Sequence, residues 1–302
     1  MRPGLSPRAQ QPIASNLRRS RYTTEVTPAE RSGRVRVAVV TCALFFSLQG
    51  TAWPQAPAGD RQMGSADAVR VAHVLVALAD NRYQGIVPVP AAIGNGDDAG
   101  HNLYWGAAFG FRTFFTRSTG WKPVGSCRPG NGPVLERCIF RHRLSSVVVV
   151  ADAYRGREIK RAISDFFAFA AGRSPEKVPL GDKESVVAGG ASDLVAYVGH
   201  DGLMDFALDH YEYPADSKAR DAVIVACASK YYFADALRRT GAKPLLWTTG
   251  LMAPEAYVIE AVLAGWANHE PEEQVRRRAA QAYDRYQRCG SKAALNLFAT
   301  GR

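Results

Sequence analysis

The stretch "SSVVVVADAY" (residues 145–154) decides the fold class. Its four consecutive valines have no polar alternation, which is typical of a strand that is buried on both faces of a sheet. Similar apolar runs recur along the chain, in "VAHVLVALAD" (71–80), "DLVAYVGHDG" (193–202), "DAVIVACAS" (221–229) and "KPLLWTTG" (243–250). We therefore expect five buried strands.

Segments with helical periodicity alternate with these runs. We expect helices over 101–118, 156–172, 232–242, 253–270 and 272–290. This alternation predicts an α/β protein, a three-layer sandwich in which helices cover both faces of a mostly parallel central sheet. Because no repeat or domain-sized linker interrupts the pattern, a single domain over 66–302 is expected.

The beginning of the chain has its own composition. Residues 1–36 contain eight arginines against two glutamates, so they supply +6 of the formal charge of +10 and leave +4 for the rest. The apolar run "VAVVTCALFFSL" (37–48) and small residues up to Ala56 follow. This order predicts a signal peptide with a long basic lead over 1–56, and a mature protein that is periplasmic or secreted and has no membrane anchor. The modest remaining charge does not indicate a nucleic-acid partner.

If the protein is exported, its cysteines are candidates for disulfide bonds, because thiols outside the cytoplasm tend to oxidise. Cys127 and Cys138 flank the turn-rich "RPGNGPVLER" and are expected to form a disulfide. Cys227 and Cys289 remain, either as a second bridge or as a reactive thiol and a bystander.

Reactive side chains follow several of the expected strands: Asp80, Asp152, His200 and Cys227. Ligands gather at the carboxyl ends of the strands in a parallel sheet, so these residues are candidates for one site. A thiolate attacks a carbonyl carbon, and an imidazole can take the thiol proton, so His200 and Cys227 could form a catalytic dyad.

Trp247 and Thr248, at the end of the fifth run, could wall a substrate pocket, or Trp247 could belong to the core. The alternatives for the dyad are a structural loop histidine and a small buried cysteine. Asp80 and Asp152 could instead cap a helix or hold a turn. Asp201 and Asp205 could orient the His200 ring or bind a cation.

The loop over 85–105 carries Asn95, Asp97, Asp98, His101 and Asn102 among glycines and prolines. Its oxygen atoms could bind Ca²⁺, although the spacing does not match an EF-hand, and turn chemistry with Asn102 as a helix cap explains it equally well.

"GHDG" (199–202) and "VIVACAS" (223–229), each behind an apolar strand, resemble the His-Gly and Ala-Cys motifs of the caspase, gingipain, legumain and clostripain clan of cysteine peptidases. The likeness covers roughly 70–266, mostly as an order of elements. It implies the caspase-hemoglobinase fold, with His200 as base or proton donor and Cys227 as nucleophile.

The same resemblance suggests further roles. Backbone N–H groups of Gly202 and Cys227 would hold the oxyanion, although Asp201 separates Gly202 from the histidine, unlike in most members. Asp80 would favour a basic side chain before the scissile bond. The expected partner is a peptide or protein substrate, with no metal or cofactor in the chemistry. The alternative is a catalytically inactive relative that binds a peptide or a glycan in the same cleft.

Overall fold

A nine-stranded sheet organises residues 68–301, the part of the chain that the computed structural model describes. Its parallel strands are β1 (Arg70–Ala77), β5 (Val147–Tyr154), β8 (Leu194–Val198), β9 (Asp221–Val225) and β10 (Lys243–Thr248). They lie in the order β10–β9–β8–β1–β5, so in chain order the sheet is 2-1-3-4-5, a doubly wound arrangement. The predicted mixed α/β fold with a mostly parallel sheet is confirmed. The predicted signal peptide, 1–56, lies outside the described residues.

Antiparallel strands extend this sheet at both edges. At one edge β4 (Val134–His142) pairs with β5, and β2 (Trp121–Pro123) and β3 (Arg128–Pro129) pair with β4. At the other edge β11 (Phe298–Ala299) pairs with β10. A separate hairpin consists of β6 (Pro175–Pro179) and β7 (Ser185–Gly189).

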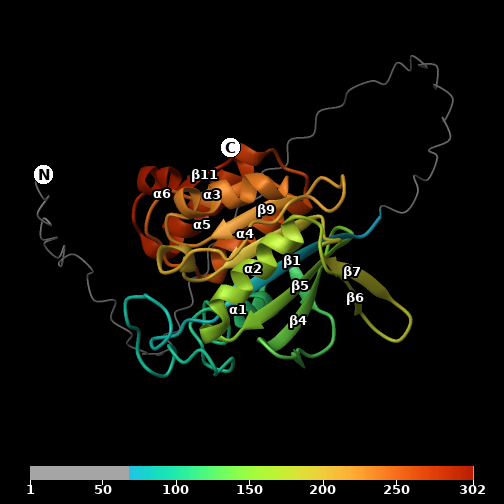
Figure 1. The fold of residues 1–302 in the computed structure, drawn as a ribbon, viewed down its shortest axis with the longest axis horizontal. Helices are drawn as coiled ribbons and strands as arrows, with labels where there is room; N and C mark the ends of the chain where they lie inside the picture. Colours follow the sequence, from blue (N-terminus) through green and yellow to red (C-terminus); the bar gives the residue numbers. More distant parts are fainter. Residues whose placement is uncertain (1–67, 302) are drawn as a thin grey trace, which may run out of the picture. The chain divides into compact units, whose positions relative to one another are not determined.

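Both faces of the central strands are apolar, as the uninterrupted valine run predicts. Val74 and Val76 of β1 pack in one hydrophobic cluster, whereas the alternating Leu75 and Ala77 pack in the other. A strand with period-two side chains buries both sets only when layers cover both faces. Figure 1 shows α2 lying over β1 and β5.

Helices form the two outer layers. On one face lie α2 (Ile159–Ala170) and α3 (Ser229–Thr240). The other face is covered by α1 (Phe111–Arg117), α4 (Ala256–Ala267) and α5 (Glu272–Gln287), with α6 (Ser291–Leu297) beside α5. Short 3₁₀ turns, η1 (Gly156–Glu158) and η2 (Gly202–Met204), precede α2 and follow β8. No helix within residues 68–301 combines the length and the apolar character that crossing a bilayer requires.

The expected helix over 101–118 is wrong in its first half. Only α1 is helical, and residues 101–110 form turns. Asn102 does not cap a helix, because its buried side chain exchanges hydrogen bonds of 3.0 and 2.8 Å with the backbone of Ala79. Gly106 lies so close to Gly100 that a side chain at 106 would collide with the Gly100 carbonyl group. A helix is therefore replaced by turns that pack against the end of β1.

The predicted disulfide is present in the structure between Cys127 and Cys138, whose Cα atoms are 4.3 Å apart. It joins the segment at β3 to β4. Cys227 and Cys289 are both free thiols, so the alternative second bridge does not form in this structure.

Candidate active site

His200 and Cys227 follow adjacent parallel strands at matching positions. The register pairs Val198 of β8 with Val225 of β9, so each candidate residue lies two positions beyond the last pair. The backbone N–H of Gly199 continues the contact by donating to the Val225 carbonyl oxygen at 3.2 Å. The sheet therefore brings the two loops together at its carboxyl edge, as the sequence predicts.

The His200 ring is held by a carboxylate. Its Nε2 lies 2.7 Å from Asp205 Oδ2, and the side chain is only 8% exposed. Asp205 in turn accepts a hydrogen bond of 3.0 Å from the backbone N–H of Gly85. A carboxylate at Nε2 favours the tautomer with its proton there, which leaves Nδ1 as the acceptor nitrogen. Of the two roles weighed for Asp205, the structure places it to orient the ring.

Cys227 lies in a half-buried setting that keeps it a thiol. Its Sγ is 3.4 Å from both the backbone nitrogen and the carbonyl oxygen of Met252. Burial raises the pKa of the thiol, and the negative charge of Asp201 adds to that increase. Within the described residues no hydrogen bond joins Cys227 to His200, so the two groups are neighbours in register but are bonded to other partners.

The turn after Cys227 is conformationally unusual. Ala228 has φ +46°, a left-handed conformation that costs energy for a residue with a Cβ. Ser229 begins α3, and its hydroxyl donates to the Ile224 carbonyl oxygen at 3.2 Å. Thr248 Oγ1 accepts the Ser229 backbone N–H at 3.2 Å and donates to the Ala226 carbonyl oxygen. These bonds fix the backbone around Cys227, and such local strain occurs preferentially at functional sites.

Asp201 is the most perturbed carboxyl group of this edge. Its side chain is fully buried; Oδ1 accepts from the Leu203 backbone N–H at 3.0 Å, and Oδ2 has no hydrogen-bond partner among the described residues. Burial, with a smaller effect from Asp205, raises the pKa of Asp201 to about 7. From sequence, Asp201 is predicted only to orient the ring or bind a cation, because burial cannot be read from an isolated acidic residue in a loop.

Two backbone N–H groups bear on the expected oxyanion site. Neither Gly202 nor Cys227 donates its backbone N–H in a hydrogen bond to another residue within 68–301. Gly202 is buried, and a Cβ there would lie 2.7 Å from the ring of Phe206, so glycine is also needed for packing. Whether these groups hold an oxyanion stays a prediction.

A cavity of about 430 Å³ lies beside Asp205, on the α3 side of the sheet. Its lining combines the large side chains of Met204, Phe206, Tyr211 and Tyr232 with polar groups that include Asp205 and Asp235. Met204, Tyr211 and Tyr232 are each more than 40% exposed, which is unusual for large apolar side chains that lie together. The cavity is therefore a candidate substrate pocket next to the histidine.

Three other predicted residues have structural roles. Asp80 is 5% exposed, and its Oδ1 accepts the backbone N–H groups of Arg82 and Tyr83 at 2.9 and 3.2 Å, which is the turn-holding alternative. Trp247 is 3% exposed within the apolar cluster under α2 and α3, and Thr248 is fully buried. Neither lines the cavity beside Asp205. Trp247 lines a separate, smaller cavity of about 170 Å³ between α3 and β10.

Asp152 belongs to a buried polar chain elsewhere in the sheet. Its carboxylate lies 2.9 Å from His73 Nε2 and accepts two bonds of 2.6 and 2.7 Å from Arg137, which also binds Glu176. The backbone N–H of Gly189 donates to His73 Nδ1 at 3.0 Å, so the ring proton is on Nε2 and points to Asp152. Neither His73 nor Arg137 is predicted from sequence, although a histidine within a fully apolar run is a signal for a buried partner.

Possible metal ligands are already engaged. Within the described residues, the only close group of three is Cys127, Glu136 and Cys138, and the disulfide removes its two sulfur ligands. In the loop over 85–105, Asp97 pairs with Arg155 and Arg157 at 2.5 and 2.6 Å, and Asp98 lies 2.9 Å from His101 Nδ1. The loop therefore follows the expected turn chemistry, without Asn102 as a helix cap, and its acids form ion pairs that were not predicted.

Comparison with known proteins finds no family model that matches the chain, and no similar curated protein or solved structure. The geometry of the site therefore carries the functional argument alone.

Proposed function

We propose that the chain is an exported cysteine peptidase-like hydrolase of caspase-like fold, in which Cys227 is the nucleophile and His200 the base. The observation that carries the proposal is the register of β8 and β9, which places the two residues at equivalent positions beyond adjacent parallel strands. The contact between His200 Nε2 and Asp205 adds an orienting carboxylate and leaves Nδ1 as acceptor.

The proposed chemistry is acyl transfer. His200 Nδ1 takes the proton of Cys227, and Sγ attacks the carbonyl carbon of the scissile peptide bond. The protonated imidazole then gives its proton to the leaving amine as the C–N bond breaks. Water, deprotonated by the same imidazole, attacks the thioester and releases the acid and the thiol. The uncommitted N–H groups of Gly202 and Cys227 would stabilise the oxyanion.

Substrate binding has to bring the two groups into contact. In the structure His200 contacts Asp205, Cys227 contacts Met252, and the pKa of the thiol is raised. We propose that a peptide in the cavity beside Asp205 displaces the surrounding loops and excludes water, because catalytic hydrogen bonds often tighten only when substrate is bound. The aromatic side chains in the lining of the cavity, Phe206, Tyr211 and Tyr232, favour a substrate with a large apolar or aromatic side chain.

A second candidate is a binding protein of the same fold that holds a peptide or a glycan without cleaving it. The raised pKa of Cys227 and the absence of a hydrogen bond from Cys227 to His200 within the described residues favour this alternative.

Thiol labelling distinguishes these candidates. A peptidyl acyloxymethyl ketone with an apolar side chain should label wild-type protein, and Cys227→Ala should abolish labelling. Cys289→Ala is the matched control, because it removes the other free thiol and should leave labelling unchanged. His200→Ala should slow labelling by about 10²-fold or more, since base catalysis contributes on that order. Labelling that survives in Cys227→Ala, or that does not depend on His200, would exclude the dyad.

Export is a separate part of the proposal. The disulfide between Cys127 and Cys138 supports an oxidising compartment, because such bonds rarely persist in the cytoplasm. Fractionation of bacterial cells that express the full chain should recover a processed form in the periplasm or medium, with this disulfide intact in non-reducing mass spectrometry. Full-length protein that stays reduced in the cytoplasm would contradict it.

A further inference from the structure

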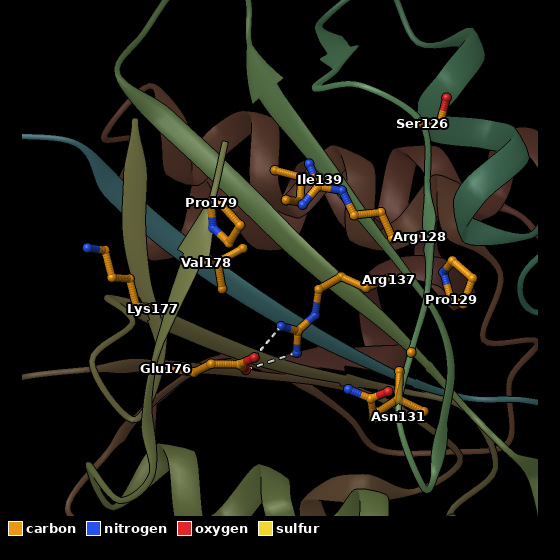
Figure 2. Close-up of a pocket in the computed structure, with 12 residues that line it drawn as sticks. Ser126, Arg128, Pro129, Asn131, Arg137, Ile139, Glu176, Lys177, Val178 and Pro179 are labelled. Carbon is orange, nitrogen blue, oxygen red and sulfur yellow. Dashed lines mark hydrogen bonds and ion pairs between the residues drawn. The ribbon is translucent and has the colours of Figure 1, made fainter. Parts of the chain in front are cut away.

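A second cavity, of about 320 Å³, lies between the β3–β4 segment and the β6–β7 hairpin. Its residues differ from those of the cavity beside Asp205. Figure 2 shows its two walls: Ser126, Arg128 and Pro129 on one side, and Val178 and Pro179 of β6 on the other. The disulfide between Cys127 and Cys138 ties the first wall to β4, so this wall is fixed in place.

Arg137 of β4 is held at the cavity from behind. Its Nε and Nη2 donate to Asp152 at 2.6 and 2.7 Å, and Asp152 is 1% exposed and also bound to His73. A guanidinium group that is fixed along one edge by a buried carboxylate presents its other N–H groups in a defined direction. These groups face the cavity.

An internal carboxylate occupies that free edge. Arg137 Nη1 and Nη2 donate to the two oxygen atoms of Glu176 at 2.5 and 2.9 Å, and Figure 2 shows the two side chains meeting across the cavity. The Glu176 side chain is 45% exposed, whereas that of Asp152 is 2% exposed. Water and external carboxylates can reach the exposed Glu176, so an external carboxylate can exchange with it while the buried Asp152 keeps Arg137 in place.

The rest of the lining favours an anionic ligand. Three cationic residues, Arg128, Arg137 and Lys177, border the cavity against the single acid Glu176. Arg128 forms no ion pair with any residue from 68 to 301, although most arginines of this part do. Figure 2 shows the Lys177 side chain directed away from Arg137, so Arg128 is the main additional cation.

Apolar groups complete the walls. Val134, Ile139 and Val178 lie beside the arginine, together with two prolines. Carboxylate recognition within apolar walls suits an acidic side chain with apolar neighbours in a peptide, and suits a free, fully hydrated ion less well.

We propose that this cavity binds an acidic peptide segment, whose carboxylate replaces Glu176 on Arg137 while Arg128 binds it from the rim. The ligand is a peptide with a glutamate between apolar residues. The site is separate from His200 and Cys227 and does not depend on their chemistry.

Fluorescence anisotropy tests the proposal with wild-type protein. The probes are a fluorescein-labelled peptide amide in which one glutamate lies between two valines, and the same peptide with glutamine instead. At about 0.15 M salt, the glutamate peptide should bind about tenfold more tightly or better, since a bidentate charge-assisted pair is lost with glutamine. Mass spectrometry of the recovered probe verifies that it is intact.

Two variants give opposite shifts. Arg128→Ala should weaken binding of the glutamate peptide about fivefold, and Glu176→Gln should strengthen it about fivefold, because the internal competitor is weakened. Arg117→Ala removes an exposed arginine outside the cavity and should change affinity less than about twofold.

Several results would overturn the proposal. One is equal affinity of the wild-type protein for the two peptides. Another is an affinity for the glutamate peptide that is weaker or unchanged in Glu176→Gln. The third is a loss of affinity in Arg117→Ala as large as that in Arg128→Ala. Displacement of the peptide by about 1 mM inorganic phosphate at the same salt would indicate a phosphate site instead. Unchanged thermal unfolding of Glu176→Gln and Arg128→Ala verifies that the variants are folded.

Discussion

At the scale of single residues, the ionisation of Cys227 is controlled by burial and by Asp201. Both raise the pKa of the thiol, and the Asp201 carboxylate is ionised above its own pKa of about 7. Asp201→Asn removes the charge but keeps an oxygen that can accept the Leu203 N–H. The pKa of Cys227 should therefore fall, so a larger fraction of the thiol should be ionised at a given pH.

The pH profile of alkylation measures this change. Iodoacetamide rates should be recorded in a Cys289→Ala background, which removes the other free thiol. The midpoint should shift to lower pH in Asp201→Asn and stay in place in Asp182→Asn, a control at an exposed residue of the β6–β7 turn. An unchanged midpoint in Asp201→Asn would mean that burial alone sets the pKa of the thiol.

Thr248 shows why a side chain predicted to touch substrate can serve the backbone instead. Its hydroxyl is fully buried between the Ser229 N–H and the Ala226 carbonyl group. The isosteric Thr248→Val removes the hydroxyl and leaves the Ser229 N–H and the Ala226 carbonyl oxygen without this hydrogen-bond partner. The free energy of unfolding should fall by about 1–3 kcal/mol. Urea unfolding gives the value, and Thr119→Val, at an exposed residue, should cost less than about 0.5 kcal/mol. A neutral Thr248→Val would show that the turn after Cys227 does not rely on this hydroxyl.

At the scale of elements, the strands that are buried on both faces are the ones that the sequence predicts. The five parallel strands were predictable because layers on both faces require uninterrupted apolar runs, as in Val147–Val150. The antiparallel strands β4 and β6 were not, because "VLERCIFRH" and "PEKVP" mix charged residues and prolines with apolar ones. The register that brings His200 beside Cys227 follows from topology, whereas the bond from His200 to Asp205 depends on the path of a loop, which no periodicity describes.

The disulfide is the covalent constraint on β3 and β4. Cys127 and Cys138 are 11 residues apart, and closing a loop of that size contributes about 3 kcal/mol on the chain-entropy estimate. The double variant Cys127→Ser, Cys138→Ser should lose about that much unfolding free energy in urea. Dithiothreitol should lower wild-type stability similarly and leave the double variant unchanged. A reductant effect of equal size in both would point to another cause.

At the scale of the whole molecule, one network of polar side chains, buried except at Arg137 and Glu176, connects the sheet to the β6–β7 hairpin. His73 is on β1, Arg137 on β4, Asp152 on β5 and Glu176 on β6, and the Gly189 N–H of β7 donates to His73. These segments are far apart in sequence, so this network of hydrogen bonds and ion pairs can form only when the fold is complete. Burying charges is costly, and removing one partner leaves the other uncompensated.

Asp152→Asn tests how much stability this chain supports. Burial tends to raise the pKa of Asp152, but hydrogen bonds from Arg137 and His73, together with the charge of Arg137, outweigh burial and lower it. Since the folded pKa lies below the unfolded value of about 3.9, ionised Asp152 stabilises the fold at neutral pH, and this contribution disappears as pH falls through the folded pKa. Asp152→Asn should cost about 3–5 kcal/mol in urea at pH 7, and the difference from wild type should shrink below about pH 4. Asp235→Asn breaks an exposed pair with Arg238 and should cost less than about 1 kcal/mol at either pH. A loss that is equally small in both variants would mean that the buried chain adds nothing to stability and would point to binding, through Arg137, as the reason for its presence.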